Sequence, residues 1–121
     1  MKSADAIAAL GALAHEHRLA IFRVLIEHGP DGLPAGVIAD NVGLVPSSLT
    51  FHLQHLTRSG LLTQRRQSRQ IFYAADFAAM NELIGYLTDN CCTASGVCAP
   101  DCQLEIAEDR RAARKRRSER A

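Results

Sequence analysis

Hydrophobic positions in the first part of the chain recur at the spacing of an α-helix. One set falls within residues 7–13 and a second within residues 19–26. Because a helix repeats about every 3.6 residues, each set predicts an apolar stripe along one helix face. Polar residues around His15 separate the two sets, and the turn-forming residues 29–32 stop the second. The pattern therefore predicts two helices joined near His15.

Two further helices follow, with a short joint between them. The first covers about residues 34–41, with Pro34 in its first turn and Gly43 after its end. The second opens at Pro46 and runs to Gly60. Proline fits the first turn of a helix because no backbone donor is needed there, and glycine accommodates the left-handed backbone that ends one. Two helices with so tight a joint predict a helix-turn-helix.

The next segment changes from helices to strands. Residues 61–66 and 70–75 predict two strands around a polar turn at residues 67–69, which is a β-hairpin. Residues 77–90 then return to helical periodicity, with apolar side chains on one face. The predicted fold class is mainly α with one β-hairpin, in the element order of a winged helix-turn-helix protein.

Length and charge predict one domain followed by a tail. With 121 residues the chain is long enough for one domain with a core and too short for two ordinary ones. Its net charge of +1 conceals a segregation, because residues 76–109 carry seven acidic groups and no basic one, and residues 110–121 carry seven basic groups and one acidic. We expect a folded domain over residues 1–90, a cysteine-containing segment over 91–109 and a basic tail without fixed structure over 110–121.

Membrane and export signals are not apparent in the sequence. The longest apolar run, residues 6–14, is far shorter than the roughly 20 residues that span a bilayer. It is not preceded by the basic segment and small-residue cleavage pattern of a signal peptide. We therefore expect a cytoplasmic protein without a membrane partner, in which the cysteines are reduced thiols.

The fourth predicted helix divides into two faces. Leu49, Leu53 and Leu56 recur at helical spacing and anchor it to the core. Polar side chains near the start of such a helix reach base edges in the major groove, and its backbone amides approach phosphates. The aromatic residue in this set either contacts a thymine methyl group or packs against the scaffold. The candidate DNA-contacting residues of the helix are Ser47, Ser48, Thr50, Phe51, His52 and Gln54.

Three arginines cluster around the turn of the predicted hairpin, namely Arg65, Arg66 and Arg69. Flexible cations at such a place sit over phosphates or enter the minor groove. The alternative is a solvated strand edge that its charge protects against aggregation. Beside a helix-turn-helix we interpret the three arginines as DNA contacts. The basic residues 110–121 have the same two interpretations, a DNA-binding arm or a solvated tail, and we favour the tail.

All four cysteines lie within twelve residues, as Cys91, Cys92, Cys98 and Cys102. Thiolates select soft acceptors such as Cu(I), Zn(II), Cd(II), As(III) or Sb(III). Trivalent arsenic forms three bonds, whereas a structural zinc ion takes four ligands, commonly from cysteine pairs with two or more residues between them. The adjacent Cys91-Cys92 fits the zinc pattern poorly. A tetrahedral Zn, Cd or Pb site, thiol redox sensing and incidental thiols remain as alternatives.

Two other kinds of site are less favoured. His15 and His17 lie two residues apart on a predicted helix and should diverge, so we expect no histidine metal ligand. The sequence shows no Cys-x-x-Cys motif, phosphate loop or paired nucleophile and base, so we assign no catalytic residue and expect a binding protein rather than an enzyme. A thiol oxidoreductase would need a thiol of depressed pKa, which the nearby Asp89, Asp101 and Glu105 disfavour.

Residues 10–25, 33–43, 47–56 and 60–73, in this order, resemble the ArsR family of bacterial metal-sensing repressors. The resemblance covers about residues 8–90. It implies a winged helix-turn-helix fold, double-stranded operator DNA as partner, and a homodimer formed by the first and last helices. The residues that it implies at the dimer interface are Ile7, Leu10, Met80, Leu83, Ile84 and Leu87.

The arrangement Cys91-Cys92-x5-Cys98, just after the last predicted helix, looks like that of an arsenic-responsive branch of this family. In that branch three such cysteines bind As(III). The resemblance implies a repressor that holds its operator when metal-free and releases it on binding As(III), or Sb(III), as inducer, with no permanent cofactor. Cys102 is then a spare thiol, an alternative third ligand or a fourth ligand for another metal.

Overall fold

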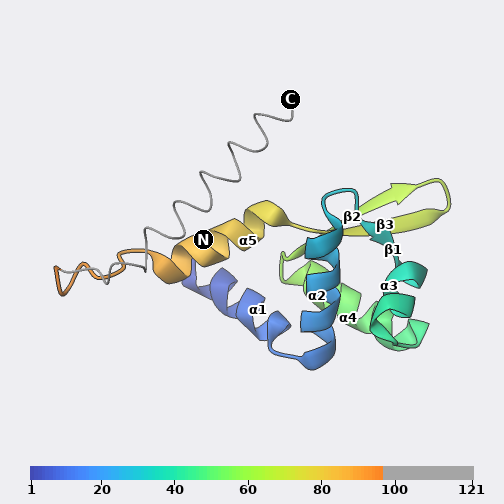
Figure 1. Cartoon of the computed structure of the whole chain (residues 1–121), viewed down its shortest axis with the longest axis horizontal. Coiled ribbons are helices and arrows are strands. Elements are labelled where there is room, and N and C mark those ends of the chain that lie inside the picture. Colours follow the sequence, from blue (N-terminus) through green and yellow to red (C-terminus); the bar gives the residue numbers. More distant parts are fainter. Residues whose placement is uncertain (97–121) are drawn as a thin grey trace. The chain divides into compact units, whose positions relative to one another are not determined.

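The structure, a computed structural model, describes residues 1–96. Its elements follow the order predicted from the sequence, with one added strand (Figure 1). The helices are α1 (Ser3–Leu13), α2 (Glu16–His28), α3 (Ala35–Val42), α4 (Pro46–Arg58) and α5 (Phe77–Thr88). The strands are β1 (Leu33–Pro34), β2 (Leu62–Gln67) and β3 (Gln70–Ala75). The predicted winged helix-turn-helix fold class is confirmed.

The joint between α3 and α4 is short because the residues at its ends suit it. Gly43 adopts a left-handed backbone with φ of 70°, and its N–H donates to the carbonyl of Ala39 at 2.9 Å. This is a common way for a helix to end. Pro46 then occupies the first turn of α4, where a backbone donor has no helical partner. The two helices contact each other, as the pair of a helix-turn-helix does.

The three strands form one antiparallel sheet in the order β1-β3-β2. β2 and β3 pair along their whole length, which confirms the predicted hairpin. Ser68 takes a left-handed backbone with φ of 57° in the turn, so the hairpin closes without a glycine there. The unpredicted strand β1 places Leu33 opposite Tyr73 of β3. It ties the start of α3 to the hairpin.

The first compact unit comprises Met1–Tyr86 and holds the hydrophobic core. The residues of α1 that face this core are alanines, and their small side chains allow α1 to contact α4. A second unit begins at Leu87, within α5, whereas we predicted the boundary after residue 90. In the part of the chain that the structure describes, none of the helices combines the length and the apolar character needed to span a bilayer.

Gly32 is expected to be intolerant of substitution. Its φ of +77° is left-handed, and an added Cβ would lie 2.6 Å from the carbonyl oxygen of Tyr73. We expect Gly32→Ala to lower the free energy of unfolding by about 2 kcal/mol or more, because backbone strain and displacement of β3 add. Urea unfolding followed by circular dichroism measures the loss. Gly36→Ala is the control, because in the described part of the chain its added Cβ has no atom within 4 Å apart from its chain neighbours and its own helix backbone. Equal losses in both variants would contradict this account.

Candidate nucleic-acid interface and thiol pair

One face of α4 fixes this helix to the core. Leu49, Leu53 and Leu56 are each exposed by 1% or less, which confirms the predicted anchoring face. The helix contacts α1, α2, α3 and β2. A helix held from this many directions presents its remaining face in one orientation, and recognition of base edges requires such a fixed orientation.

The opposite side of α4 carries exposed side chains in its N-terminal half. The hydroxyl of Thr50 donates to the carbonyl of Pro46 at 2.9 Å, and its oxygen still has acceptor capacity. Phe51 is 63% exposed, so it faces solvent rather than packing into the core. This favours the first of its two interpretations, contact with a thymine methyl group. We define the reading face of α4 as the exposed residues Ser47, Ser48, Thr50, Phe51 and Gln54.

His52 does not belong to the reading face, although we predicted it as a DNA contact. Only 8% of its surface is exposed, and its buried Nδ1 atom has no hydrogen-bond partner among residues 1–96. His52 follows Leu49 by three positions and precedes Leu56 by four, which places it on the anchoring face. The structure therefore corrects this prediction, because the imidazole is turned into the protein.

His52 instead faces two histidines at the junction of α1 and α2. The ring centroids of His15 and His52 lie 4.8 Å apart, and those of His17 and His52 lie 5.8 Å apart. Our prediction that His15 and His17 diverge along a helix is wrong, because His15 is extended and caps α2, accepting a hydrogen bond at Nδ1 from the N–H of His17. Within residues 1–96 no three or more His, Cys, Asp or Glu side chains are grouped as a metal ion requires.

The buried imidazole predicts a pH dependence of stability. Burial lowers the pKa of His52 below its ordinary value of 6.5, and the positive charges of His15 and Arg18 lower it further. The unfolded chain therefore binds a proton at a higher pH than the folded chain does. The stability that neutral His52 contributes is present above pH 6.5 and is lost as the pH falls through the folded pKa, with a slope of at most about 1.4 kcal/mol per pH unit.

Urea unfolding at several pH values between neutrality and mild acidity measures this slope. We expect His52→Gln to have a shallower slope than the wild type, because its side chain does not titrate. His28→Gln is the matched control, since His28 is an exposed histidine at the end of α2. A wild-type slope in His52→Gln would show that other groups cause the acid sensitivity.

The three hairpin arginines differ in their surroundings. Nη2 of Arg65 donates to the carbonyl oxygen of Asp31 at 3.0 Å, and the guanidinium lies 5.1 Å from the centroid of the Phe72 ring. Both contacts hold Arg65 against the protein. Arg66 and Arg69 are exposed near the tip of the hairpin, which extends away from α4 in Figure 1. These two cations are therefore better placed to reach phosphates than Arg65.

Arg69→Ala is expected to weaken binding to operator and random DNA alike. Each lost phosphate contact lowers the slope of log K against log salt concentration by about 0.9. Fluorescence anisotropy over a series of salt concentrations measures this slope. Arg23→Ala is the control, because Arg23 is an exposed arginine that pairs with Glu27 on α2. An unchanged slope in Arg69→Ala would identify the hairpin turn as a solvated edge.

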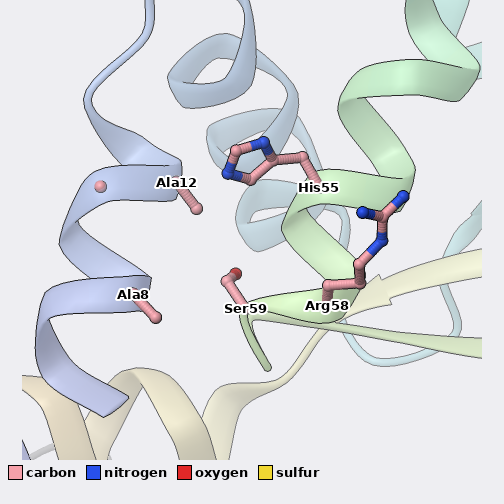
Figure 2. A pocket seen from close by; sticks show the side chains of 6 residues that line it. Ala8, Ala12, His55, Arg58 and Ser59 are labelled. Carbon is pink, nitrogen blue, oxygen red and sulfur yellow. The ribbon is translucent and has the colours of Figure 1, made fainter. Parts of the chain in front are cut away.

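A cavity of about 450 Å³ opens between α1 and the C-terminal end of α4 (Figure 2). The small residues of α1 form one wall, and Figure 2 shows Ala8 and Ala12 facing it. His55, Arg58 and Ser59 form the other wall. No residue of the reading face lines this cavity, so it is separate from the surface that we assign to DNA.

The side chains predicted for a dimer interface divide between the surface and the chain's own core. Ile7 is 68% and Leu10 is 42% exposed on α1, and Leu87 of the second unit is 58% exposed. Leu83 is 5% exposed and belongs to the core, and Met80 packs against it. The structure therefore corrects the assignment of Leu83, whose side chain is already buried within the protomer. Ile84 is half-buried.

Two of the four cysteines fall within the described residues. Cys91 and Cys92 are half-buried and follow the end of α5, and their Sγ atoms lie 3.4 Å apart. The hydrogen bond with Cys92 raises the pKa of the Cys91 thiol, and burial raises it further. A raised pKa keeps Cys91 protonated at neutral pH, unlike the reactive thiolates of redox enzymes. Cys98, the third predicted ligand, and Cys102, a possible additional one, lie outside the described residues.

Comparison with known proteins agrees with this geometry. The family model described as a helix-turn-helix domain matches residues 13–65. The chain is 32% identical over 80 residues to the nodulation protein NolR of Rhizobium meliloti, covering 66% of this chain and 63% of NolR. It is 34% identical over 85 residues to the transcriptional activator HlyU of Vibrio cholerae, covering 68% of this chain and 76% of HlyU. The match thus spans just under two thirds of NolR.

Solved structures share the same arrangement. Reduced HlyU from Vibrio cholerae aligns with a TM-score of 0.55 at 34% identity, covering 72% of this chain and 92% of HlyU. The homodimeric winged helix-turn-helix DNA-binding domain of Mb0332 from Mycobacterium bovis, described as a possible ArsR-family regulator, aligns with a TM-score of 0.57 at 25% identity, covering 73% and 82%. The chain therefore belongs to the winged helix-turn-helix DNA-binding transcriptional regulators of the ArsR, NolR and HlyU type.

Proposed function

We propose that the protein is a homodimeric repressor that holds operator DNA through α4 and the β2–β3 hairpin and releases it when As(III) binds to Cys91, Cys92 and Cys98. The observation that supports As(III) binding is the 3.4 Å separation of the Cys91 and Cys92 sulfur atoms. The two thiols follow α5 after a gap of two residues, so we expect their ligation to act on the C-terminal end of this helix. In this proposal As(III) binding causes release of the operator and not its retention.

The surface of the first unit supports DNA binding in two ways. The reading face presents hydroxyl, amide and aromatic groups without an acidic side chain, so it meets the negative backbone of DNA without repulsion. The hairpin adds the exposed cations Arg66 and Arg69. Side chains on the helix read base edges, and the arginines contribute sequence-independent affinity.

The dimer follows from the need for two half-sites. One protomer presents a single α4, and specific operators commonly contain two half-sites related by a two-fold axis. Ile7 and Leu10 leave apolar surface exposed on α1, which a second copy would cover. The related Mb0332 domain is described as homodimeric. We assign Ile7 and Leu10 of the first unit to the interface and keep Leu83 in the core of each protomer.

The number of bonds favours trivalent arsenic over a tetrahedral metal. As(III) accepts three thiolate sulfurs, and Cys91 and Cys92 supply two that are already adjacent. Cys98 is the third in our proposal, and Cys102 is dispensable. Sb(III) has the same valence and a similarly soft character, so it is expected to act as a second inducer. A structural zinc site would need four ligands, which makes Cys102 the residue that separates the two possibilities.

Thiol redox sensing is the second candidate, because the 3.4 Å sulfur separation also suits oxidation of the pair. In that reaction two thiols and one hydrogen peroxide give a disulfide and two water molecules. The raised pKa of the Cys91 thiol disfavours attack by peroxide at Cys91, because peroxide reacts with the thiolate. We rank redox sensing below arsenite sensing because the arrangement Cys91-Cys92-x5-Cys98 resembles that of the arsenic-responsive branch.

One titration separates these candidates. The reduced protein first selects its operator from a pool of random duplexes, since the operator sequence is unknown. The complex is then titrated with arsenite, antimonite, zinc, cadmium and hydrogen peroxide while fluorescence anisotropy reports bound DNA. We expect release by arsenite and antimonite only. Release by zinc or cadmium alone would indicate a tetrahedral site, and release by peroxide alone would indicate a redox sensor.

A further inference from the structure

His52 links the anchoring face of α4 to its reading face. Its side chain is turned into the protein, with 8% of its surface exposed. The centroids of the Phe51 and His52 rings lie 5.6 Å apart, and the two rings meet edge to face. Phe51 belongs to the reading face. A displacement of the His52 ring therefore changes both the attachment of α4 and the position of a side chain that we assign to base contact.

Among residues 1–96, the surroundings of His52 offer no carboxylate that could stabilise an imidazolium ion. The charged groups that act on His52 are all basic, and they come from α2, from the residue that caps it and from α4 itself. They are His15, His17, Arg18 and His55. α1, α3 and β2 also contact α4 but add no such group. A protonated His52 would therefore be a buried cation without a partner, which is costly.

The basic groups of the α1–α2 junction are held close to the imidazole. The ring centroids of His15 and His17 lie 4.8 and 5.8 Å from that of His52. Nε of Arg18 donates to the carbonyl of Ala12 at 2.6 Å, which fixes the guanidinium at the end of α1. Arginine keeps its charge at every pH at which proteins fold. The position of α4 in this structure, which we call the docked position, thus accommodates only a neutral His52.

We propose that His52 positions the reading face of α4 only while its imidazole is neutral, so that mild acid makes the protein release its operator. A proton on His52 drives the ring toward water, and α4 leaves the docked position with it. The reading face then no longer meets the base edges in a fixed orientation, which sequence recognition requires. The inference rests on the DNA-binding part of the proposed function and is independent of the cysteines.

The sign of the pH effect follows from the form that binds the operator. Only the docked, neutral form binds it specifically, so the apparent operator affinity is proportional to the fraction of protein in that form. This fraction falls as the pH drops through the pKa of His52, which lies below 6.5. One titrating group lowers the affinity by at most about tenfold per pH unit for each protomer. Random DNA is held through phosphates by Arg66 and Arg69 and does not need an oriented helix, so acid lowers the preference for the operator.

The ratio of operator affinity to random-DNA affinity tests the inference. The reduced full-length wild type, His52→Gln, His52→Leu and the control His28→Gln are titrated with both duplexes at one salt concentration, from about pH 7.5 to about pH 5. Fluorescence anisotropy reports binding, and circular dichroism limits the comparison to the pH range in which the helix content is unchanged. We expect the ratio to fall with pH in the wild type and in His28→Gln, by up to about tenfold per unit for each protomer. It should stay constant in both His52 variants, whose side chains do not titrate.

Nuclear magnetic resonance of the wild type provides a second measurement that needs no variant to bind DNA. The ring protons of His52 report its protonation, and their signal is identified by its loss in His52→Gln. Because the operator binds the neutral form, operator binding should lower the pKa of His52 further, by reciprocity. A pKa of His52 that the operator leaves unchanged would show that the imidazole is not coupled to DNA binding.

Three further results would overturn the inference. An operator preference that is present at neutral pH and does not fall with acid would show that His52 has no regulatory effect. A wild-type pH profile in both His52 variants would assign the effect to other groups. Loss of the helix signal together with operator binding would indicate global unfolding rather than movement of α4. If the wild type instead shows no operator preference at neutral pH, the DNA-binding part of the proposed function fails.

Discussion

Replacing any one of Cys91, Cys92 and Cys98 by serine is expected to leave the operator complex intact and to abolish its release by arsenite. Two remaining thiols bind inorganic As(III) less tightly than three and do not join the end of α5 to the segment that follows. Allosteric coupling typically amounts to about 1–3 kcal/mol, so the wild type should lose roughly 5- to 150-fold in operator affinity with arsenite. Each serine variant should keep almost all of its operator affinity when arsenite is added.

Cys102→Ser is the matched control for these three variants. It removes a thiol from the same segment but not one of the three proposed ligands, so its response to arsenite should be nearly normal. Anisotropy titrations of the selected operator with and without arsenite measure all four variants. If Cys102→Ser is as unresponsive as the others, a four-sulfur site for a tetrahedral metal is the better account. If all four variants still release DNA, the cysteines are not the sensor.

The double variant Ser47→Ala/Thr50→Ala should weaken operator binding by about 25-fold while changing binding to random DNA little. Each lost hydrogen bond contributes about 1 kcal/mol, and 1.4 kcal/mol corresponds to about a tenfold change in affinity. Both side chains are exposed on the reading face, so the loss should fall on sequence-specific contacts. Anisotropy with the two duplexes at one salt concentration measures the ratio.

Thr57→Ala controls for the helical role of the hydroxyl. The Thr57 hydroxyl donates to the carbonyl of Leu53 at 2.7 Å, just as the Thr50 hydroxyl donates to that of Pro46, but Thr57 is half-buried and lies outside the reading face. We expect Thr57→Ala to keep its preference for the operator. Equal losses on operator and random DNA in the double variant would show that the reading face is assigned incorrectly.

The fold was largely predictable because apolar residues recur at helical spacing and because proline or glycine marks the ends of α2, α3 and α4. The hairpin was also predictable, since two runs of strand-forming residues flank a short polar turn. Strand β1 was missed because two residues are too few to show a period. That strand exists through its pairing of Leu33 with Tyr73, a contact between distant parts of the sequence.

The assignment of His52 shows where polarity misled the site prediction. The spacing of His52 from Leu49 and Leu56 already predicts the anchoring face. We assigned His52 to the DNA-contacting side because its side chain is polar. The convergence of His15 and His17 on His52 depends on the extended backbone of His15, which a continuous helical pattern does not reveal. Similarly, the 3.4 Å approach of the Cys91 and Cys92 sulfurs depends on the left-handed backbone of Cys92.

The most direct test of the central claim measures both sides of the linkage between arsenic and DNA. Operator affinity is determined with and without saturating arsenite, and arsenite affinity is determined with and without saturating operator, all with the reduced wild-type protein. Thermodynamic reciprocity requires the two ratios to be equal. We predict that arsenite weakens operator binding, that operator weakens arsenite binding by the same factor, and that both ratios approach one in Cys98→Ser. Tight arsenite binding that leaves operator affinity unchanged would contradict the account, because the thiols would then be uncoupled from DNA.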